Sequence, residues 1–216
     1  MRRKTLLLNM YEAMSAALGP SHWWPGESTF EVVVGAMLAQ NTNWENVARA
    51  ILNLKQAKLL APELLYTLPE ADLAELIRPA GYFRLKAKRL KNMLIFLKNE
   101  CRFDLDQLAG QELESLRPKL LEVKGVGPET ADSVLLYALH KPSFVVDAYT
   151  KRIASRHGLV PEDAGYDELR DFFMDLLPTD VRFYNEYHAL LVRTAKQWCR
   201  KQKPLCPACP LNIYLD

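Results

Sequence analysis

The hydrophobic residues recur with the period of an α-helix along nearly the whole chain. Near the amino terminus Leu7, Met10 and Met14 mark one helical face, which Gly19 ends. Ser28 and Glu31 then have the spacing of a capping box ahead of an apolar run. Further stretches with this period lie near 43–54, 61–66, 69–77, 84–99, 111–122, 128–139, 147–157, 166–176 and 182–199. The pattern predicts an all-α protein of about ten short helices, since the one strand-like run, 145–146, is too short for a sheet.

Composition narrows the class of protein. The 216 residues allow one large domain or two compact lobes, and 49% hydrophobic with 25% charged residues excludes a disordered chain. No stretch approaches the roughly 18 apolar residues of a membrane span. The basic start followed by Leu6–Leu8 resembles a signal peptide, but Asn9 ends the apolar run early. We expect a cytoplasmic protein with no membrane partner, and the formal charge of +2 gives no reason by itself to expect nucleic acid.

Three of the four cysteines gather at the carboxyl end, as Cys199-x6-Cys206-x2-Cys209, while Cys101 stands alone. Four cysteines are too few for a disulfide framework in a chain of this length. Cysteines at such close spacing favour a metal or cluster site, without indicating which metal. The loop between the first two carries the cations Arg200, Lys201 and Lys203, which suit contact with phosphates.

A second feature is the turn Lys124-Gly125-Val126-Gly127 between two predicted helices. Two glycines permit a tight turn with φ > 0 and leave backbone N–H groups uncovered next to a helix start, which suits a phosphate oxygen. Lys124 adds a positive charge. An ordinary interhelical turn is the alternative.

Asp147 follows a short apolar run and opens a helix, which is the position of an N-cap. A carboxylate can cap a helix and also act in catalysis, so both roles stay open.

The tryptophans form a further group. Trp23-Trp24-Pro25 lies in a loop, and Trp44 ends a polar segment that begins at Gln40. Core packing is the usual role of tryptophan, and a stacking pocket for a planar ligand is the alternative.

Taken in this order, the features resemble the helix-hairpin-helix (HhH-GPD) DNA glycosylase superfamily, endonuclease III branch. The resemblance rests on the Leu-x-x-x-Gly-Val-Gly-x-x-Thr-Ala hairpin, the downstream Val-Asp-x-x-x-x-Arg and the cysteine cluster. It implies a two-lobed helical fold: a six-helix barrel over 30–141, and a second lobe from 1–29 and 142–216, with the active site between them. It also implies a monomer that binds double-stranded DNA and flips a damaged base out of the stack.

The resemblance assigns roles to residues. Asp147 matches the aspartate needed to break the N-glycosidic bond, and Gln40 matches the residue that fills the gap left by the flipped nucleotide. The hairpin from Gly125 to Gly127, with Thr130, matches the DNA-binding motif.

Glu129 departs from the pattern of members that also cut the strand. Those members carry a lysine at this position, which attacks the sugar as a Schiff-base nucleophile. Glutamate cannot form an imine, and Lys124 lies on the other side of the hairpin. The chain should therefore hydrolyse the glycosidic bond and leave an intact abasic site, which disfavours an endonuclease III-type lyase.

The cysteine cluster departs as well, because Leu215 stands where the family has its fourth cysteine. We expect an iron–sulfur cluster, of the four-iron (4Fe-4S) type, with Asp216 or solvent as the last ligand. A three-iron cluster, zinc with His188, and loss of the metal are the alternatives.

The substrate class follows from the resemblance to the 3-methyladenine glycosylases of this branch. A pocket made by Trp23-Trp24-Pro25, Trp44 and Glu129 would suit an alkylated, cationic purine through stacking. A uracil or thymine mismatch glycosylase is the nearest alternative. A non-catalytic DNA-binding module and a redox or metal-storage protein are alternatives of other classes.

The basic residues cluster in sequence, with the densest group between Arg84 and Lys91, namely Arg84, Lys86, Lys88, Arg89 and Lys91. We expect this segment to contribute to a basic face that meets DNA.

Overall fold

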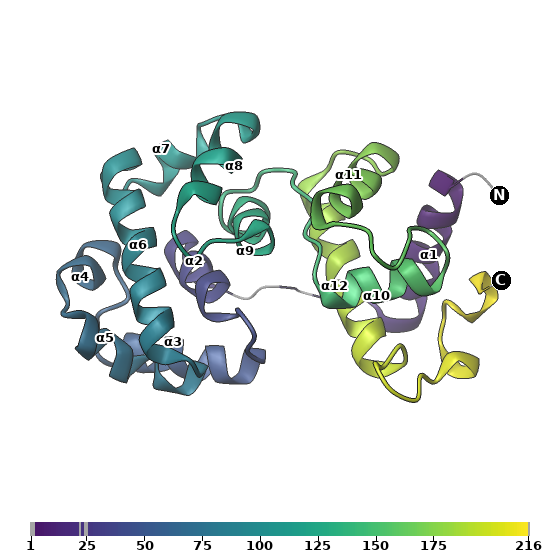
Figure 1. Cartoon of the computed structure of the whole chain (residues 1–216), viewed down its shortest axis with the longest axis horizontal. Coiled ribbons are helices and arrows are strands. Elements are labelled where there is room, and N and C mark those ends of the chain that lie inside the picture. The colour runs from purple at the N-terminus through teal and green to yellow at the C-terminus, as the bar shows by residue number, and fades with distance from the viewer. Residues whose placement is uncertain (1–2, 22, 24–25, 216) are drawn as a thin grey trace. The chain divides into compact units, whose positions relative to one another are not determined.

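The computed structural model describes residues 3–21, 23 and 26–215. Every regular element in these ranges is helical and none is a strand, which confirms the all-α prediction (Figure 1). Contacts divide the chain into two compact units. We call Trp24–Lys141 the central unit, and Met1–Trp23 with Pro142–Asp216 the terminal unit. No helix in the described ranges is long and apolar enough to cross a membrane.

The central unit is built around α6 (Phe83–Cys101), which packs against the short helices on either side of it. The buried face of α6 includes Leu90, Met93 and Leu94. Its remaining helices are α2 (Thr29–Leu38), α3 (Trp44–Gln56), α4 (Pro62–Thr67), α5 (Glu70–Leu76), α7 (Leu105–Ala109), α8 (Leu113–Glu122) and α9 (Pro128–Ser133), with a 3-10 turn at Arg78–Ala80 and a π-helical turn at Val134–Ala138.

Helix α2 is buried on all sides, as its run of apolar residues requires. Ser28 caps it by accepting a hydrogen bond from the Glu31 N–H at 3.2 Å. The buried Glu31 carboxylate is paired with Lys55 Nζ at 2.9 Å, so the helix begins without an unpaired buried charge.

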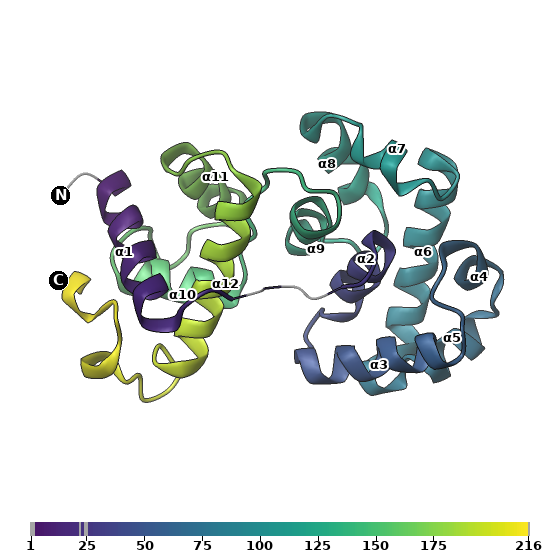
Figure 2. The same ribbon diagram turned by 180° about the vertical axis from the view of Figure 1, so that it is seen from behind.

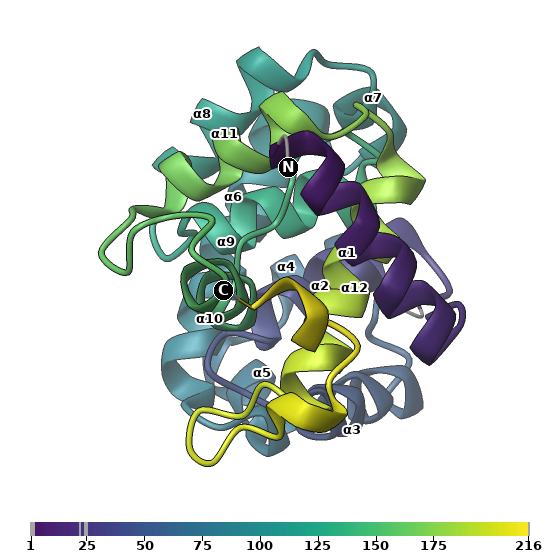
Figure 3. The same cartoon turned by 90° about the vertical axis from the view of Figure 1, so that its right-hand side faces the viewer.

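The terminal unit is organised around α12 (Val181–Gln197), which packs against α1 (Arg3–Leu18) and α10 (Ala148–Arg156) (Figures 2 and 3). The fourth helix is α11 (Tyr166–Leu176). In the core of this unit Phe144 stacks on Phe173 with ring centroids 4.4 Å apart. The Tyr187 hydroxyl donates to Leu7 O at 2.8 Å, and burial raises the pKa of Tyr187, so it stays neutral.

Lys86, in the basic segment of α6, cannot contribute to the expected basic surface, because it is only 2% exposed. Its Nζ donates to Leu38 O at 2.7 Å, Ala80 O at 2.8 Å and the Thr42 hydroxyl at 2.5 Å. Burial, with the nearby Arg89 charge, lowers the pKa of Lys86 to about 8. Lys86 therefore joins the end of α2 to the turn before α6.

A second lysine of this segment is also used internally. Lys91 Nζ donates to the backbone oxygens of Leu65, at 2.6 Å, and of Tyr66 and Leu68, at the end of α4. Only Arg84 and Lys88 of the five are exposed. Sequence hydropathy could not distinguish the buried lysines from the exposed ones. They are the same residue type, and only their tertiary partners differ.

Replacing Lys86 with methionine should destabilise the fold, because the Leu38 carbonyl oxygen would lose its lysine donor and the Ala80 carbonyl oxygen would keep only the Thr42 hydroxyl. We expect a loss of about 3 kcal/mol in the free energy of unfolding, which lowers Tm by about 6–12 °C in a chain of this size. Urea and thermal unfolding followed by circular dichroism measure this. Lys88→Met is the matched control on the exposed face and should shift Tm little. Equal stability of the two variants would show that the Lys86 contacts do not support the fold.

Candidate active site and nucleic-acid interface

Asp147 lies at the amino end of α10 in the terminal unit. The three residues before it, Phe144–Val146, are buried and hold its backbone in place. Its Oδ1 accepts a hydrogen bond from the Thr150 N–H at 2.7 Å, so the sequence-based N-cap prediction is confirmed. The side chain is 14% exposed, and the positive end of the helix stabilises its charge.

The second carboxylate oxygen of Asp147 faces His188 of α12. The Oδ2 and Nε2 atoms are 3.5 Å apart, and the two side chains are 14% and 5% exposed. Burial by itself would raise the pKa of Asp147, but His188 and the bonds from Thr150 outweigh it, so the pKa lies below its ordinary value. The arrangement therefore holds a sheltered carboxylate in its ionised form.

An aromatic side chain lies beside this pair. Trp23 meets the His188 ring edge-on, with centroids 6.3 Å apart and the planes at 71°. Trp24 and Pro25 lie outside the described residues. Of the predicted base pocket, the structure thus brings Trp23 next to the Asp147–His188 pair, while Trp44 and Glu129 belong to the central unit.

The predicted hairpin is present in the central unit, where α8 and α9 are joined by residues 123–127. Gly125 has a φ of +100°, and a Cβ there would meet the Arg89 side chain at 2.4 Å, so this position requires glycine. Of the two glycines, only Gly125 uses a positive φ, since Gly127 is extended with φ −96°. The Val126 N–H is also not uncovered, because it donates to Val123 O at 2.9 Å.

Gln40 is joined to this hairpin by its side-chain amide. Its Nε2 donates to Gly125 O and to the Thr130 hydroxyl, both at 3.0 Å. Its Oε1 accepts from Arg89 Nη1 at 2.5 Å. All the hydrogen-bonding atoms of this amide are engaged, so entry of Gln40 into DNA would require breaking these bonds.

Helix α6 therefore supports the hairpin from one side. Besides Arg89, Asn92 donates from Nδ2 to Lys124 O at 2.8 Å. The Lys124 side chain itself is exposed, as is Glu129 in the first turn of α9. Lys124 precedes the Gly125–Gly127 segment in sequence, and Glu129 follows it within α9.

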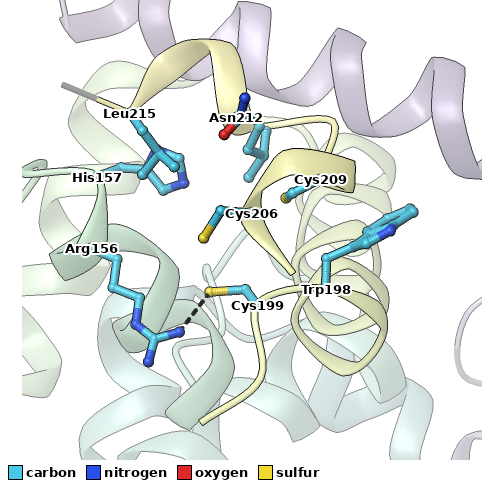
Figure 4. Close-up of a pocket in the computed structure, with 9 residues that line it drawn as sticks. Arg156, His157, Trp198, Cys199, Cys206, Cys209, Asn212 and Leu215 are labelled. Carbon is cyan, nitrogen blue, oxygen red and sulfur yellow. Dashed lines mark hydrogen bonds between the residues drawn. The ribbon is translucent and has the colours of Figure 1, made fainter. Parts of the chain in front are cut away.

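The three clustered cysteines line one pocket in the terminal unit (Figure 4). The other residues that line it are Arg156, His157, Trp198, Leu211, Asn212 and Leu215. His188 is not among them and lies against Asp147, so the alternative of zinc bound by His188 is wrong. Burial raises the pKa of the Cys209 thiol, and the charges of Cys199 and Cys206 raise it further. Such thiols become thiolates when a bound cation offsets their charge.

Three thiols that line one pocket are the type of ligand that binds iron–sulfur clusters. Among the described residues, no three Cys, His, Asp or Glu side chains are grouped closely enough to hold one metal ion. A zinc ion would need every sulfur about 2.3 Å from one point. A cluster binds each thiolate through a different iron atom and suits cysteines spaced around a hollow.

The loop that carries the cations is fixed to α10 by two arginines. Arg152 Nε donates to Cys199 O at 2.8 Å, and Arg156 donates to Arg200 O at 2.8 Å and Lys201 O at 3.1 Å. The backbone of the loop is thus held on the protein, while the side chains of Arg200, Lys201 and Lys203 are exposed.

Sequence reasoning missed His188 as a neighbour of Asp147. A signal was present, because His188 falls on the helical stripe of Tyr184, Tyr187 and Leu191, all of which are buried. A histidine in such a stripe needs a polar partner, although the sequence does not say which one.

Comparison with known proteins matches most of the chain to DNA repair proteins. Residues 34–179 match the family described as "HhH-GPD superfamily base excision DNA repair protein". A protein of Methanocaldococcus jannaschii named "Putative DNA repair glycosylase MJ1434" is 49% identical over 211 residues, which are 97% of this chain and 95% of that protein. The endonuclease III of Thermotoga maritima is 31% identical over 87% of this chain and 82% of its own length.

A solved structure is similar as well. It is an H. pylori 3-methyladenine DNA glycosylase bound to 1,N6-ethenoadenine, with a TM-score of 0.78 and 28% identity, over 91% of this chain and 98% of that one. The family match covers more than half of the chain, and the helical fold agrees with it. The chain belongs to the HhH-GPD superfamily and is a DNA glycosylase of its endonuclease III branch.

Proposed function

We propose that this chain is a monofunctional glycosylase that releases an alkylated purine, such as 3-methyladenine, from double-stranded DNA and leaves an abasic site. The observation on which the proposal depends is Asp147, a sheltered carboxylate kept ionised beside His188. We further propose that it works as a monomer, in the cytoplasm.

The charge of Asp147 suits the chemistry of base release. Departure of the base leaves an oxocarbenium-like sugar, and a fixed negative charge close by stabilises that state. The same carboxylate can orient the attacking water or accept its proton. Oδ1 is committed to the Thr150 N–H, which leaves Oδ2, on the His188 side, as the oxygen that would face the reacting sugar or the water.

The absence of lyase activity is inferred from Glu129. The position that supplies a nucleophilic amine in strand-cutting members holds Glu129, an exposed carboxylate in the first turn of α9. A carboxylate cannot form the imine that precedes β-elimination.

The inference of an alkylated purine rests on charge and aromatic contact. A purine alkylated at N3 or N7 is cationic, stacks well on indole and is a good leaving group. Trp23 is half-buried beside the Asp147–His188 pair, and an ionised carboxylate favours a cationic base. The 28% identity to the H. pylori 3-methyladenine glycosylase supports this choice.

We also infer that Cys199, Cys206 and Cys209 hold an iron–sulfur cluster. When bound, the cluster would cross-link the carboxyl-terminal loop to the end of α12. Arg152 and Arg156 fix the loop backbone. The side chains of Arg200, Lys201 and Lys203 would then contact DNA phosphates.

A substrate panel tests the proposal. Duplexes with one 3-methyladenine, 7-methylguanine, uracil or T·G site are incubated with the protein, and released base and strand scission are measured separately. We expect release of the alkylated purines, with strand scission only after alkali. Release from the pyrimidine substrates alone would favour the mismatch glycosylase, which is the second candidate, and scission without alkali would refute the monofunctional assignment.

Replacing Asp147 with asparagine should lower single-turnover base release by at least about 100-fold, because the carboxylate charge is lost. Asparagine caps helices as well as aspartate does, so the fold should persist. Asp180→Asn is the matched control, since Asp180 caps α12 through a 2.7 Å bond to the Phe183 N–H and is exposed. Duplex binding should be retained in both variants. Normal release by Asp147→Asn would remove the role assigned to this residue and favour a non-catalytic use of the site.

A further inference from the structure

The cysteine pocket has three thiols and no fourth. Leu215, which occupies the position of the fourth cysteine in the family pattern, lines the pocket but has no atom that can bind iron. Cys101 does not line this pocket, and its Sγ lies 3.1 Å from Leu97 O within α6. A four-iron cluster here needs another donor.

His157 lies in the same pocket, at the carboxyl end of α10. Figure 4 shows its ring on the side of the pocket that faces Cys206. Its Nδ1 is 3.1 Å from Tyr214 O. A carbonyl oxygen only accepts hydrogen bonds, so Nδ1 carries the proton, and Nε2 is the nitrogen with the lone pair in the neutral ring. Histidines that bind metals commonly have this arrangement, with the other ring nitrogen bound to a carbonyl.

The segment that fixes the His157 tautomer is itself held in place. The Tyr214 hydroxyl donates to Asn9 O of α1 at 3.3 Å, while the Tyr214 carbonyl meets His157 of α10. The carboxyl-terminal segment therefore runs between α1 and α10 (Figure 3). This contact orients the imidazole without using Nε2.

Among the described residues that line the pocket, no other is an equal candidate, and Asp216, which the sequence also suggested, lies outside the described residues. Arg156 is a cation, and its Nη1 lies 3.4 Å from Cys199 Sγ, where it can donate to a thiolate. Trp198 and Leu211 are apolar residues of the pocket wall. The side-chain amide of Asn212 is a weak ligand for iron. Imidazole is an established ligand of iron–sulfur centres in place of cysteine.

We propose that His157 Nε2 is the fourth ligand of a four-iron cluster held by Cys199, Cys206 and Cys209. The inference rests on the cluster part of the proposed function and adds a ligand that the family pattern does not contain. Exchange of one thiolate for a neutral imidazole makes the cluster site one unit less negative, which raises its reduction potential.

The direct test uses the full-length protein purified without oxygen, after growth with 15N-labelled histidine. Iron and sulfide are quantified, and the cluster is brought to a paramagnetic state for pulsed electron paramagnetic resonance. We expect about four iron atoms per chain and a hyperfine coupling from a histidine 15N. A cluster with no histidine coupling would overturn the assignment of His157 while leaving the proposed cluster intact. A wild-type protein without iron and sulfide would overturn both.

Two substitutions connect the signal to this residue. His157→Ala should remove the coupling and lower the iron content from about four to about three atoms per chain. Adding Leu215→Cys to that variant should restore the content, because it returns the family's fourth thiol. His140→Ala, at an exposed histidine of the central unit, is the control and should change neither. An unchanged coupling in His157→Ala would refute the proposal.

Discussion

The hydrogen bond from the Thr150 N–H to Asp147 fixes the start of α10, and most of the terminal unit's proposed chemistry depends on that helix. Its amino end holds Asp147 against His188, and further along it carries Arg152 and Arg156, which bind the backbone of the cysteine loop. His157, which follows the last turn, lines the cysteine pocket. One short helix thus positions the candidate catalytic carboxylate and the candidate cluster site. A substitution at the Asp147 end should affect the cysteine pocket, or the reverse, only if the whole of α10 moves.

In the central unit, α6 likewise positions several neighbouring segments. Arg89 and Asn92 hold the hairpin, and Lys86 ties the segment before α3 to the turn before α6. Gln40 lies at the centre of these contacts, bound to Gly125 and Thr130. These bonds fix the conformation of the hairpin, and moving Gln40 away from it would require breaking them. Of the cations on α6, Lys86, Arg89 and Lys91 serve this internal scaffolding, while Arg84 and Lys88 are exposed.

Helical periodicity predicted the fold class and most helices, because burial of one apolar face dominates each of them. It also located the Asp147 cap, which depends only on residues three apart. It did not locate the Asp147–His188 pair, or the Arg89–Gln40 bond, because these partners are 41 and 49 residues apart in sequence. Lys86 shows the same limit: its charge suggested a surface, while three acceptors from distant segments allow it to be buried. Local signals specify caps and turns, whereas polar pairing in the core depends on tertiary packing.

The role proposed for Asp147 in base release requires that its carboxyl group be ionised. NMR titration of its carboxyl carbon tests this most directly. The resonance is assigned by its absence in Asp147→Asn, and it is followed with pH in wild-type protein and in His188→Asn. We expect a wild-type midpoint below the ordinary aspartate value of 3.8, and a higher midpoint in the variant, where burial acts without the opposing histidine. A wild-type carboxyl group that is still protonated near neutral pH would contradict the role proposed for Asp147.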